Sequence, residues 1–189
     1  MGEFEHVKIL ILKIKALYPH SKIIVTFFSP SGYENVKKFE GVDLFLYLPF
    51  DLAFTMKKFY RLIRPDALLI AKYDLWPNMI WQAKKLEIPI FVINASLTKQ
   101  SSRAKGLAYY LHREIYRHLT EVWVSSESDI ERYKSLADNV LITVTGDTKF
   151  DQVIWRKENA KRNELLHSKV ILGKRVVVCG SIWPEDCEA

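Results

Sequence analysis

Six short runs of apolar and β-branched residues, each separated from the next by a helical or turn segment, constrain the fold of this chain most strongly. They lie at residues 23–28, 43–48, 67–72, 88–94, 121–125 and 140–143. The two clearest runs, Ala67 to Ala71 and Ile90 to Ile93, are apolar on both faces. Such strands are typical of a parallel sheet that helices cover on both sides. The pattern therefore predicts an α/β fold with a Rossmann-like parallel sheet and helices on both faces.

Helices are predicted from apolar spacing and from signals at their starts. Apolar residues at three- and four-residue steps predict an amphipathic helix over residues 3–18, which Pro19 ends. Ser31 and Ser126 each stand three positions before an acidic residue, the spacing of a capping serine and a supporting carboxylate. Asp74, just before Leu-Trp-Pro, is predicted either to cap a helix or to serve in a binding site.

Length and composition limit the classes of protein that fit. The 189 residues carry a net charge of +6, and this length fits one complete α/β domain with the beginning of a second. The two cysteines, Cys179 and Cys187, are too few and too close together for a disulfide framework or a zinc cluster, so a reducing, cytoplasmic setting is expected. The apolar runs are far shorter than the roughly 18 residues that span a bilayer, so the chain as given is expected to be soluble.

The positive charge suggests an anionic partner, and a phospholipid surface or a phosphorylated substrate both fit it. We expect no nucleic-acid partner. The sequence contains no G-x-G-x-x-G, Walker, G-x-S-x-G or H-E-x-x-H motif, which disfavours dehydrogenases, P-loop enzymes and zinc hydrolases. Polar segments instead follow the predicted strands, at the carboxyl edge where open parallel sheets bind ligands.

Those polar segments, with the start of the chain, form an ordered series of seven motifs. They are Gly2-Glu3, Ser29-Pro-Ser-Gly-Tyr-Glu34, Tyr47-Leu-Pro-Phe-Asp51, Asp74-Leu-Trp-Pro-Asn78, Asn94-Ala-Ser-Leu-Thr98, Ser126-Glu-Ser-Asp-Ile-Glu-Arg132 and Thr145-Gly-Asp-Thr-Lys-Phe-Asp151. In this order and spacing they resemble the N-terminal domain of the 3-deoxy-D-manno-octulosonic acid (Kdo) transferases, which build the inner core of lipopolysaccharide. The tail from Gly180 to Asp186 is similar to the start of that family's nucleotide-sugar domain.

The resemblance implies a GT-B arrangement of two Rossmann-like domains. Residues 1–151 would form the acceptor-binding domain, 152–175 a helical linker, and 176–189 the first strand of the nucleotide-sugar (donor) domain. The implied reaction is an inverting transfer of Kdo from CMP-Kdo to a lipid A precursor, at the cytoplasmic face of the bacterial inner membrane, without a metal or other cofactor. Because most of the donor domain and the usual membrane anchor are absent from the sequence, the chain alone is expected to be inactive and peripheral.

The resemblance also implies roles for individual residues. Glu3 matches the family's general base, although an acid in the first helical turn also complements the helix dipole. Asp74 stands where the family usually has glutamate, and its shorter side chain leaves its role open. The predicted acceptor-binding residues, for most of which cap or turn chemistry is a comparable explanation, are Ser31, Gly32, Asp74, Asn94 and Ser96.

A run of cations is open to two interpretations. Lys57, Lys58, Arg61 and Arg64 either form a solvated helix face or face anionic lipid, with exposed aromatics lying against acyl chains. The aromatics expected to be exposed are Phe54, Phe59 and Tyr60.

A second class of function stays open, namely a non-catalytic Rossmann-like module that binds an anionic lipid or sugar. A receiver-like signalling domain is excluded because Phe27-Phe28-Ser29 provides no acidic phosphorylation pocket.

Overall fold

The computed structural model describes residues 2–36, 38–72, 74–97, 106–159, 173–175 and 177, without the side chains of residues 2–3 and 106–108. The chain divides into two compact units, Met1–Ile154 and Trp155–Ala189. The predicted strand at 176–179 lies outside the described residues, apart from Val177.

Helices and strands alternate along the first unit, as the sequence predicts. The helices are α1 (Gly2–Leu17), α2 (Pro30–Glu34), α3 (Ala53–Ile63), α4 (Pro77–Lys85), α5 (Gly106–Tyr116), α6 (Glu127–Lys134) and α7 (Thr148–Asn159), which continues into the second unit. The strands are β1 (Ile24–Phe27), β2 (Leu44–Tyr47), β3 (Leu68–Ala71), β4 (Ile90–Ala95), β5 (Glu121–Val124) and β6 (Leu141–Val144). Each strand lies within two residues of its predicted bounds. The helical linker is predicted over 152–175; the helix α7 begins earlier, at Thr148, and residues 160–172 lie outside the described part.

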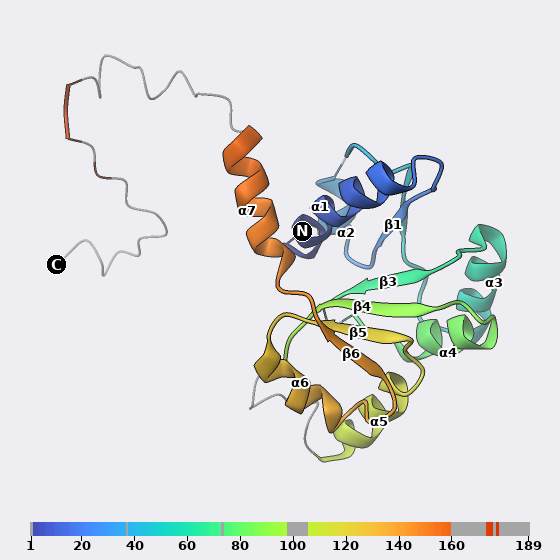
Figure 1. Cartoon of the computed structure of the whole chain (residues 1–189). Coiled ribbons are helices and arrows are strands. Elements are labelled where there is room, and N and C mark those ends of the chain that lie inside the picture. Colours follow the sequence, from blue (N-terminus) through green and yellow to red (C-terminus); the bar gives the residue numbers. More distant parts are fainter. Residues whose placement is uncertain are drawn as a thin grey trace, which may run out of the picture. The chain divides into compact units, whose positions relative to one another are not determined.

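All strand pairs are parallel, in a two-stranded sheet β1-β2 and a four-stranded sheet in the order β3-β4-β5-β6. Crossovers between parallel strands are almost always right-handed. Three successive crossovers in one direction therefore place α4, α5 and α6 on the same face of the four-stranded sheet, below it in Figure 1. The first helices, α1 and α2, lie on the other side, so the predicted Rossmann-like fold with helices on both faces is confirmed.

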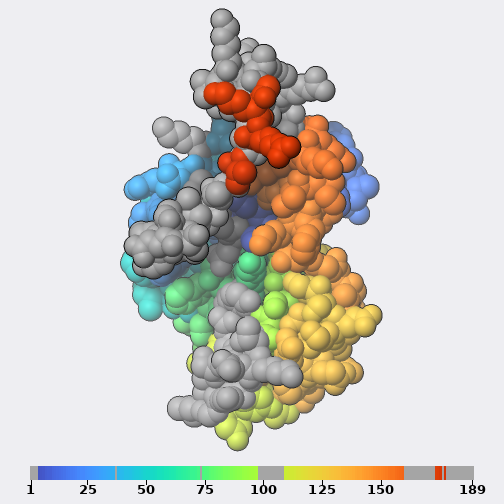
Figure 2. All heavy atoms as spheres, turned by 90° about the vertical axis from the view of Figure 1, so that its left-hand side faces the viewer, coloured from blue at the N-terminus to red at the C-terminus, as the bar shows by residue number. Residues whose placement is uncertain are grey.

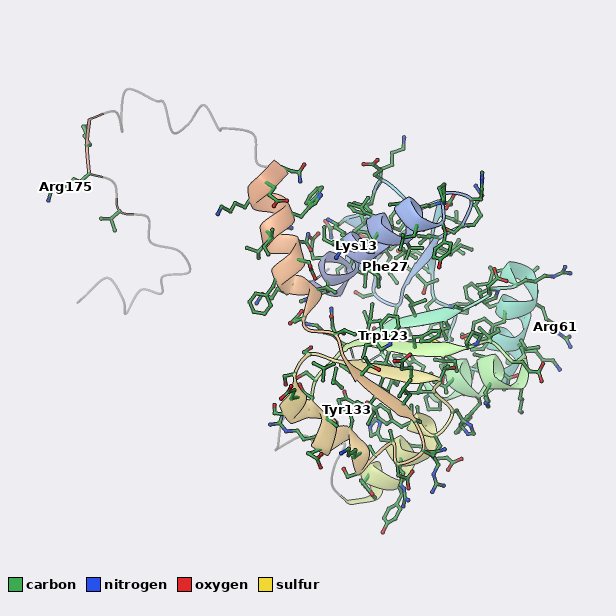
Figure 3. All side chains as sticks on the ribbon, viewed as in Figure 1. Lys13, Phe27, Arg61, Trp123, Tyr133 and Arg175 are labelled. Carbon is green, nitrogen blue, oxygen red and sulfur yellow. The ribbon has the colours of Figure 1, made fainter. Side chains whose placement is uncertain are left out.

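The main core lies between the four-stranded sheet and α3 to α6. Val92 and Val122 are fully buried against side chains such as Ile80, Tyr116 and Tyr133, and Figure 3 shows Tyr133 on the α6 side of the sheet. Alternate residues of the same strands point to the other face, which is less covered.

A second apolar cluster joins α1 to the two-stranded sheet. Phe4 of α1 is buried, and its ring centroid lies 5.7 Å from those of Phe27, Phe39 and Phe45. Phe27 lies beside α1 in Figure 3. These edge-to-face contacts fix α1 against β1 and β2.

The strand β6 forms one edge of the four-stranded sheet, since within the described residues it pairs with β5 alone. Its side chains Leu141 and Val144 are 63% and 41% exposed. None of the described helices has the length and apolar character needed to cross a lipid bilayer.

Two predicted helix starts are wrong. The helix α2 begins at Pro30 with Ser29 as its N-cap, so Ser31 lies inside it; proline is favoured at the first helical position. The N-cap of α4 is Trp76, so Asp74 is not its cap. The prediction for Ser126 is confirmed, since it is the N-cap of α6, but its hydroxyl donates to Asp129 Oδ2 at 2.7 Å and accepts no backbone N–H.

Candidate functional site

The carboxyl ends of β3 to β6 meet at one edge of the four-stranded sheet, because these strands are parallel. Several of the polar motifs lie there, and their side chains bond to one another across loops that are distant in the sequence. Figure 2 faces this edge, where orange residues of β6 and the start of α7 adjoin blue residues of α1. We take this carboxyl edge as the candidate site.

The amide of Asn94, at the end of β4, pairs with Thr148, the first residue of α7. Asn94 Nδ2 donates to Thr148 Oγ1 at 2.6 Å, and the backbone N–H of Thr148 donates to Asn94 Oδ1 at 3.2 Å. Asn94 is only 3% exposed. Its side chain therefore serves the structure of the edge and is not presented to solvent.

The first two turns of α1 are hydrogen-bonded to the start of α7 at the carboxyl edge. The Thr148 hydroxyl donates to the backbone carbonyl of His6, and Gln152 Nε2 donates to Glu5 Oε2 at 2.6 Å. His6 Nδ1 lies 3.4 Å from Asp147 Oδ1. Glu3 belongs to the first turn of this helix, although its side chain lies outside the described residues. The backbone that carries the predicted base is thus at the carboxyl edge.

A buried carboxylate organises the loops after β4 and β5. Asp129, only 2% exposed, accepts the backbone N–H of Leu97 at 3.0 Å and bonds to Arg132 Nη1 at 3.2 Å. Arg132 Nη1 also donates to the Leu97 carbonyl at 2.6 Å, and Ser96 Oγ lies 3.5 Å from Asp129 Oδ1. The predicted acceptor residue Ser96 therefore sits beside an ion pair whose carboxylate is buried.

The helix α4 is capped by a residue from a different loop. Asp51 accepts the backbone N–H groups of Asn78 and Met79 at 3.0 and 2.7 Å. Asn78 Nδ2 donates in return to the Asp51 carbonyl at 2.7 Å. Asp74, predicted for this helix or for the acceptor, is exposed on the chain leading into α4.

Ser31 and Gly32 have a structural explanation in the short helix α2. Ser31 Oγ lies 2.7 Å from Ser29 Oγ, and the backbone N–H of Gly32 donates to the Ser29 carbonyl at 3.0 Å. A Cβ at Gly32 would lie 2.6 Å from Phe27 Cδ1. Glycine is needed here because α2 packs closely on that ring, and the amide of Gly32 is already bonded.

The predicted cations on α3 and its C-cap residue Arg64 are all exposed, whereas two of the three aromatics are not. Tyr60 is buried and its hydroxyl donates to the Met79 carbonyl at 3.2 Å, and Phe59 packs against the core. Burial raises the pKa of Tyr60 well above its usual range, with a smaller contribution from Asp51. Only Phe54, 71% exposed, fulfils the expectation. Helical spacing accounts for this, since Phe59 and Tyr60 share the inward face with Met56.

Sequence reasoning missed the individual roles of Asp51, Thr148 and Gln152. Asp51 and Thr148 lie inside motifs that the sequence singled out, but their partners are 27 and 54 residues away. No local signal links such distant positions.

Two hollows in the surface of the described residues lie elsewhere. One, of about 400 Å³, is lined by Ile130, Lys134 and the residues around the start of β6, and another, of about 500 Å³, by Tyr60, Arg61, Arg64 and Ile88. Both lie toward the amino ends of the strands. Across the described residues, no three His, Cys, Asp or Glu side chains are grouped to hold a metal ion.

Known proteins resemble this chain in sequence. Residues 1–152 match the family described as 3-deoxy-D-manno-octulosonic-acid transferase (kdotransferase). The chain is 31% identical over 160 residues to a 3-deoxy-D-manno-octulosonic acid transferase of Haemophilus influenzae. The aligned residues cover 80% of this chain and 36% of that protein. A transferase of the same name from Chlamydophila psittaci is 28% identical over 192 residues, covering the whole chain and 44% of its own length. The chain thus spans less than half the length of these relatives.

Solved structures support the fold. A UDP-GlcNAc 2-epimerase from Neisseria meningitidis superimposes with a TM-score of 0.61 at 15% identity, over 90% of this chain and 49% of that one. The UDP-N-acetylglucosamine 2-epimerase from Rickettsia bellii gives a TM-score of 0.63 at 16% identity, over 88% of this chain and 48% of that one. The architecture is that of a Rossmann-like half of a GT-B protein. With the family match over residues 1–152, the chain belongs to the 3-deoxy-D-manno-octulosonic-acid transferase family.

Proposed function

We propose that this chain is the acceptor-binding part of an enzyme that transfers Kdo from CMP-Kdo to a hydroxyl of a lipid A precursor, with inversion at the anomeric carbon. One observation carries the proposal. The start of α1, whose first turn bears Glu3, is bonded to the carboxyl edge of the sheet through His6 and Thr148. Open parallel sheets bind their ligands at this edge.

In this mechanism Glu3 acts as the general base. Its carboxylate takes the proton of the acceptor hydroxyl while that oxygen bonds to the anomeric carbon of Kdo. The bond from this carbon to the phosphate oxygen breaks, and CMP leaves with the electron pair. Attack opposite to the leaving group inverts the configuration. A positioned general base contributes about 10²–10⁴-fold to such a rate.

The acceptor contacts proposed from the sequence fall into two groups. Ser31, Asp74 and Ser96 have exposed or partly exposed positions from which a side chain can reach a sugar hydroxyl or phosphate. Gly32 and Asn94 are buried, so we propose that they act by shaping the site.

We further propose that α3 docks the protein on the anionic inner membrane. Phe54, Lys57, Lys58, Arg61 and Leu62 are all exposed, and their spacing places them along one side of the helix. The stripe has an apolar residue at each end and three cations between them, and Figure 3 shows Arg61 pointing outward. Cations attract anionic headgroups while apolar residues enter the interface.

The decisive experiment for catalysis is Glu3→Gln in the transferase that carries this chain. We expect a fall in the transfer rate from CMP-Kdo of about 10²-fold or more with the fold intact. Glu40→Gln is a matched control, because it makes the same change at an exposed carboxylate. Glu40 precedes Gly41, which lies beside the later turns of α1 and not beside the first turn.

A near-normal rate for Glu3→Gln would leave Glu3 with only its favourable interaction with the helix dipole. If wild type binds anionic lipid or sugar but transfers no Kdo, the non-catalytic binding module is the better description.

A further inference from the structure

Asn94 adopts a backbone conformation that few residues adopt. Its φ is 52°, in the left-handed region, where asparagine is tolerated better than most residues. The register between β4 and β5 shifts over the same stretch, between Val92 and Ala95. At this left-handed position the Asn94 side chain bonds to Thr148, which lies 54 residues further along the sequence.

The Asn94 and Thr148 side chains form a closed pair that continues into α1. Asn94 uses both ends of its amide on Thr148, at 2.6 and 3.2 Å. The Thr148 hydroxyl accepts one of these hydrogen bonds and donates its own hydrogen bond to the His6 carbonyl. Strand β4, the start of α7 and the start of α1 are therefore held together by two side chains.

We propose that Asn94 and Thr148 are positioning residues for Glu3. They hold the first turn of α1 at a fixed place on the carboxyl edge and do not themselves touch the substrate. A helix rises about 1.5 Å per residue, so the His6 carbonyl lies less than two turns from Glu3. Misplacement of a catalytic group by about 1 Å can cost ~10²-fold in rate. This inference rests on the proposed function, because the role of Glu3 is proposed there.

Neighbouring contacts support the same assignment. Gln152 bonds to Glu5 at 2.6 Å, and Lys13 lies 3.7 Å from Asp151, so the first turns of α7 contact α1 at two further points. Thr148 is the residue of α7 that bonds both to α1 and to the end of β4.

Hydrogen exchange on this 189-residue chain tests the positioning without any activity. In Thr148→Val, we expect the amides of residues 7–10 to exchange about fivefold faster, since one typical hydrogen bond is lost. Thr148→Ser should restore wild-type exchange, and Asn94→Gly, which keeps the left-handed backbone, should resemble Thr148→Val. Thr143→Val is the matched control, because Thr143 bonds to Glu121 on the sheet and not to α1. Unchanged exchange in α1 of Thr148→Val would overturn the proposal.

Kinetics in the transferase that carries this chain test the link to Glu3. We expect Thr148→Val to lower kcat about tenfold or more, with KM for both substrates little changed. Thr148→Ser should recover the rate. When Glu3→Gln is already present, adding Thr148→Val should lower the rate no further. Multiplicative losses in the double variant would overturn the positioning role. A normal rate for Glu3→Gln alone would instead refute the proposed base, while the exchange result would still decide whether Thr148 holds α1.

Discussion

Asp51 joins two elements that are far apart in the sequence. Its carboxylate accepts two backbone N–H groups at the start of α4, from Asn78 and Met79, and Asn78 bonds back to the Asp51 carbonyl. The first N–H groups of any helix lack partners inside the helix. Asp51 therefore supplies from another loop what an N-cap residue normally supplies locally.

Removal of this carboxylate should weaken the fold. For Asp51→Ala we expect the free energy of unfolding to fall by about 0.5–2 kcal/mol, the usual cost of losing a helix cap. Urea titration followed by circular dichroism measures it. The exposed Asp66, changed to alanine in the same way, should lose less than about 0.5 kcal/mol, and an equal loss in both variants would contradict the capping role.

Capping also shows where local sequence rules stop working. They look for a cap within a few residues of the helix start, and so they favoured Asp74 for α4 and Ser31 for α2. The pairs Asp51–Asn78, Asn94–Thr148 and Asp129–Leu97 connect positions at least 27 residues apart. The motifs that contain these residues could be predicted, but their partners could not.

At the scale of elements, α3 is amphipathic in a specific way. Met56 and Tyr60 face the core, whereas Lys57, Lys58 and Arg61 face outward. Apolar periodicity predicts which residues of a helix are buried more reliably than residue type alone. Tyr60 illustrates this, since its position in the helix and not its aromatic character decides its burial.

The outward side of α3 can be tested with lipid vesicles. Lys58→Glu/Arg61→Glu should weaken binding to anionic vesicles by about 30-fold or more, since each cation near such a surface contributes on the order of 1 kcal/mol. Added salt should shrink the difference, because it shortens the Debye length. Co-sedimentation at low and high salt measures both effects.

Lys84→Glu/Lys85→Glu provides the control, because it makes the same charge change at two exposed lysines of α4. Equal weakening by both pairs would indicate a general effect of net charge. Binding that does not respond to salt would remove the docking role of α3.

At the scale of the whole molecule, the alternation of strands and helices follows from the sequence because both-face apolar strands fit only a covered parallel sheet. Ile90 to Ile93 is the clearest example, and β4 is the most buried strand. The division into two separate sheets could not be predicted, since it depends on how α1 and its Phe4 pack against β1 and β2.

Asp43 links three parts of this fold and should make its stability depend on pH. The Lys15 ammonium, the Ile23 backbone N–H and the Lys22 ammonium bond to its carboxylate and hold its pKa well below the ordinary value. In the unfolded chain Asp43 takes up a proton near pH 4, whereas in the folded chain it stays charged to lower pH. Its contribution is therefore complete above about pH 4 and is lost as the pH falls further.

Asp43→Asn should be less stable than wild type at neutral pH, and its free energy of unfolding should fall less steeply between about pH 4.5 and pH 2. Urea unfolding at a series of pH values measures the two slopes. Asp66→Asn serves for comparison, since Asp66 makes no salt bridge within the described residues. Parallel curves for wild type and Asp43→Asn would contradict the linkage.

The strand β6 has a further consequence for handling the protein. Its outer backbone groups have no ladder partner among the described residues, and Leu141 and Val144 stand exposed beside them. An edge strand of this kind can act as a template on which another extended chain adds, which favours aggregation. We therefore expect this edge, as well as the stability of the core, to limit the concentration at which the purified chain stays monodisperse.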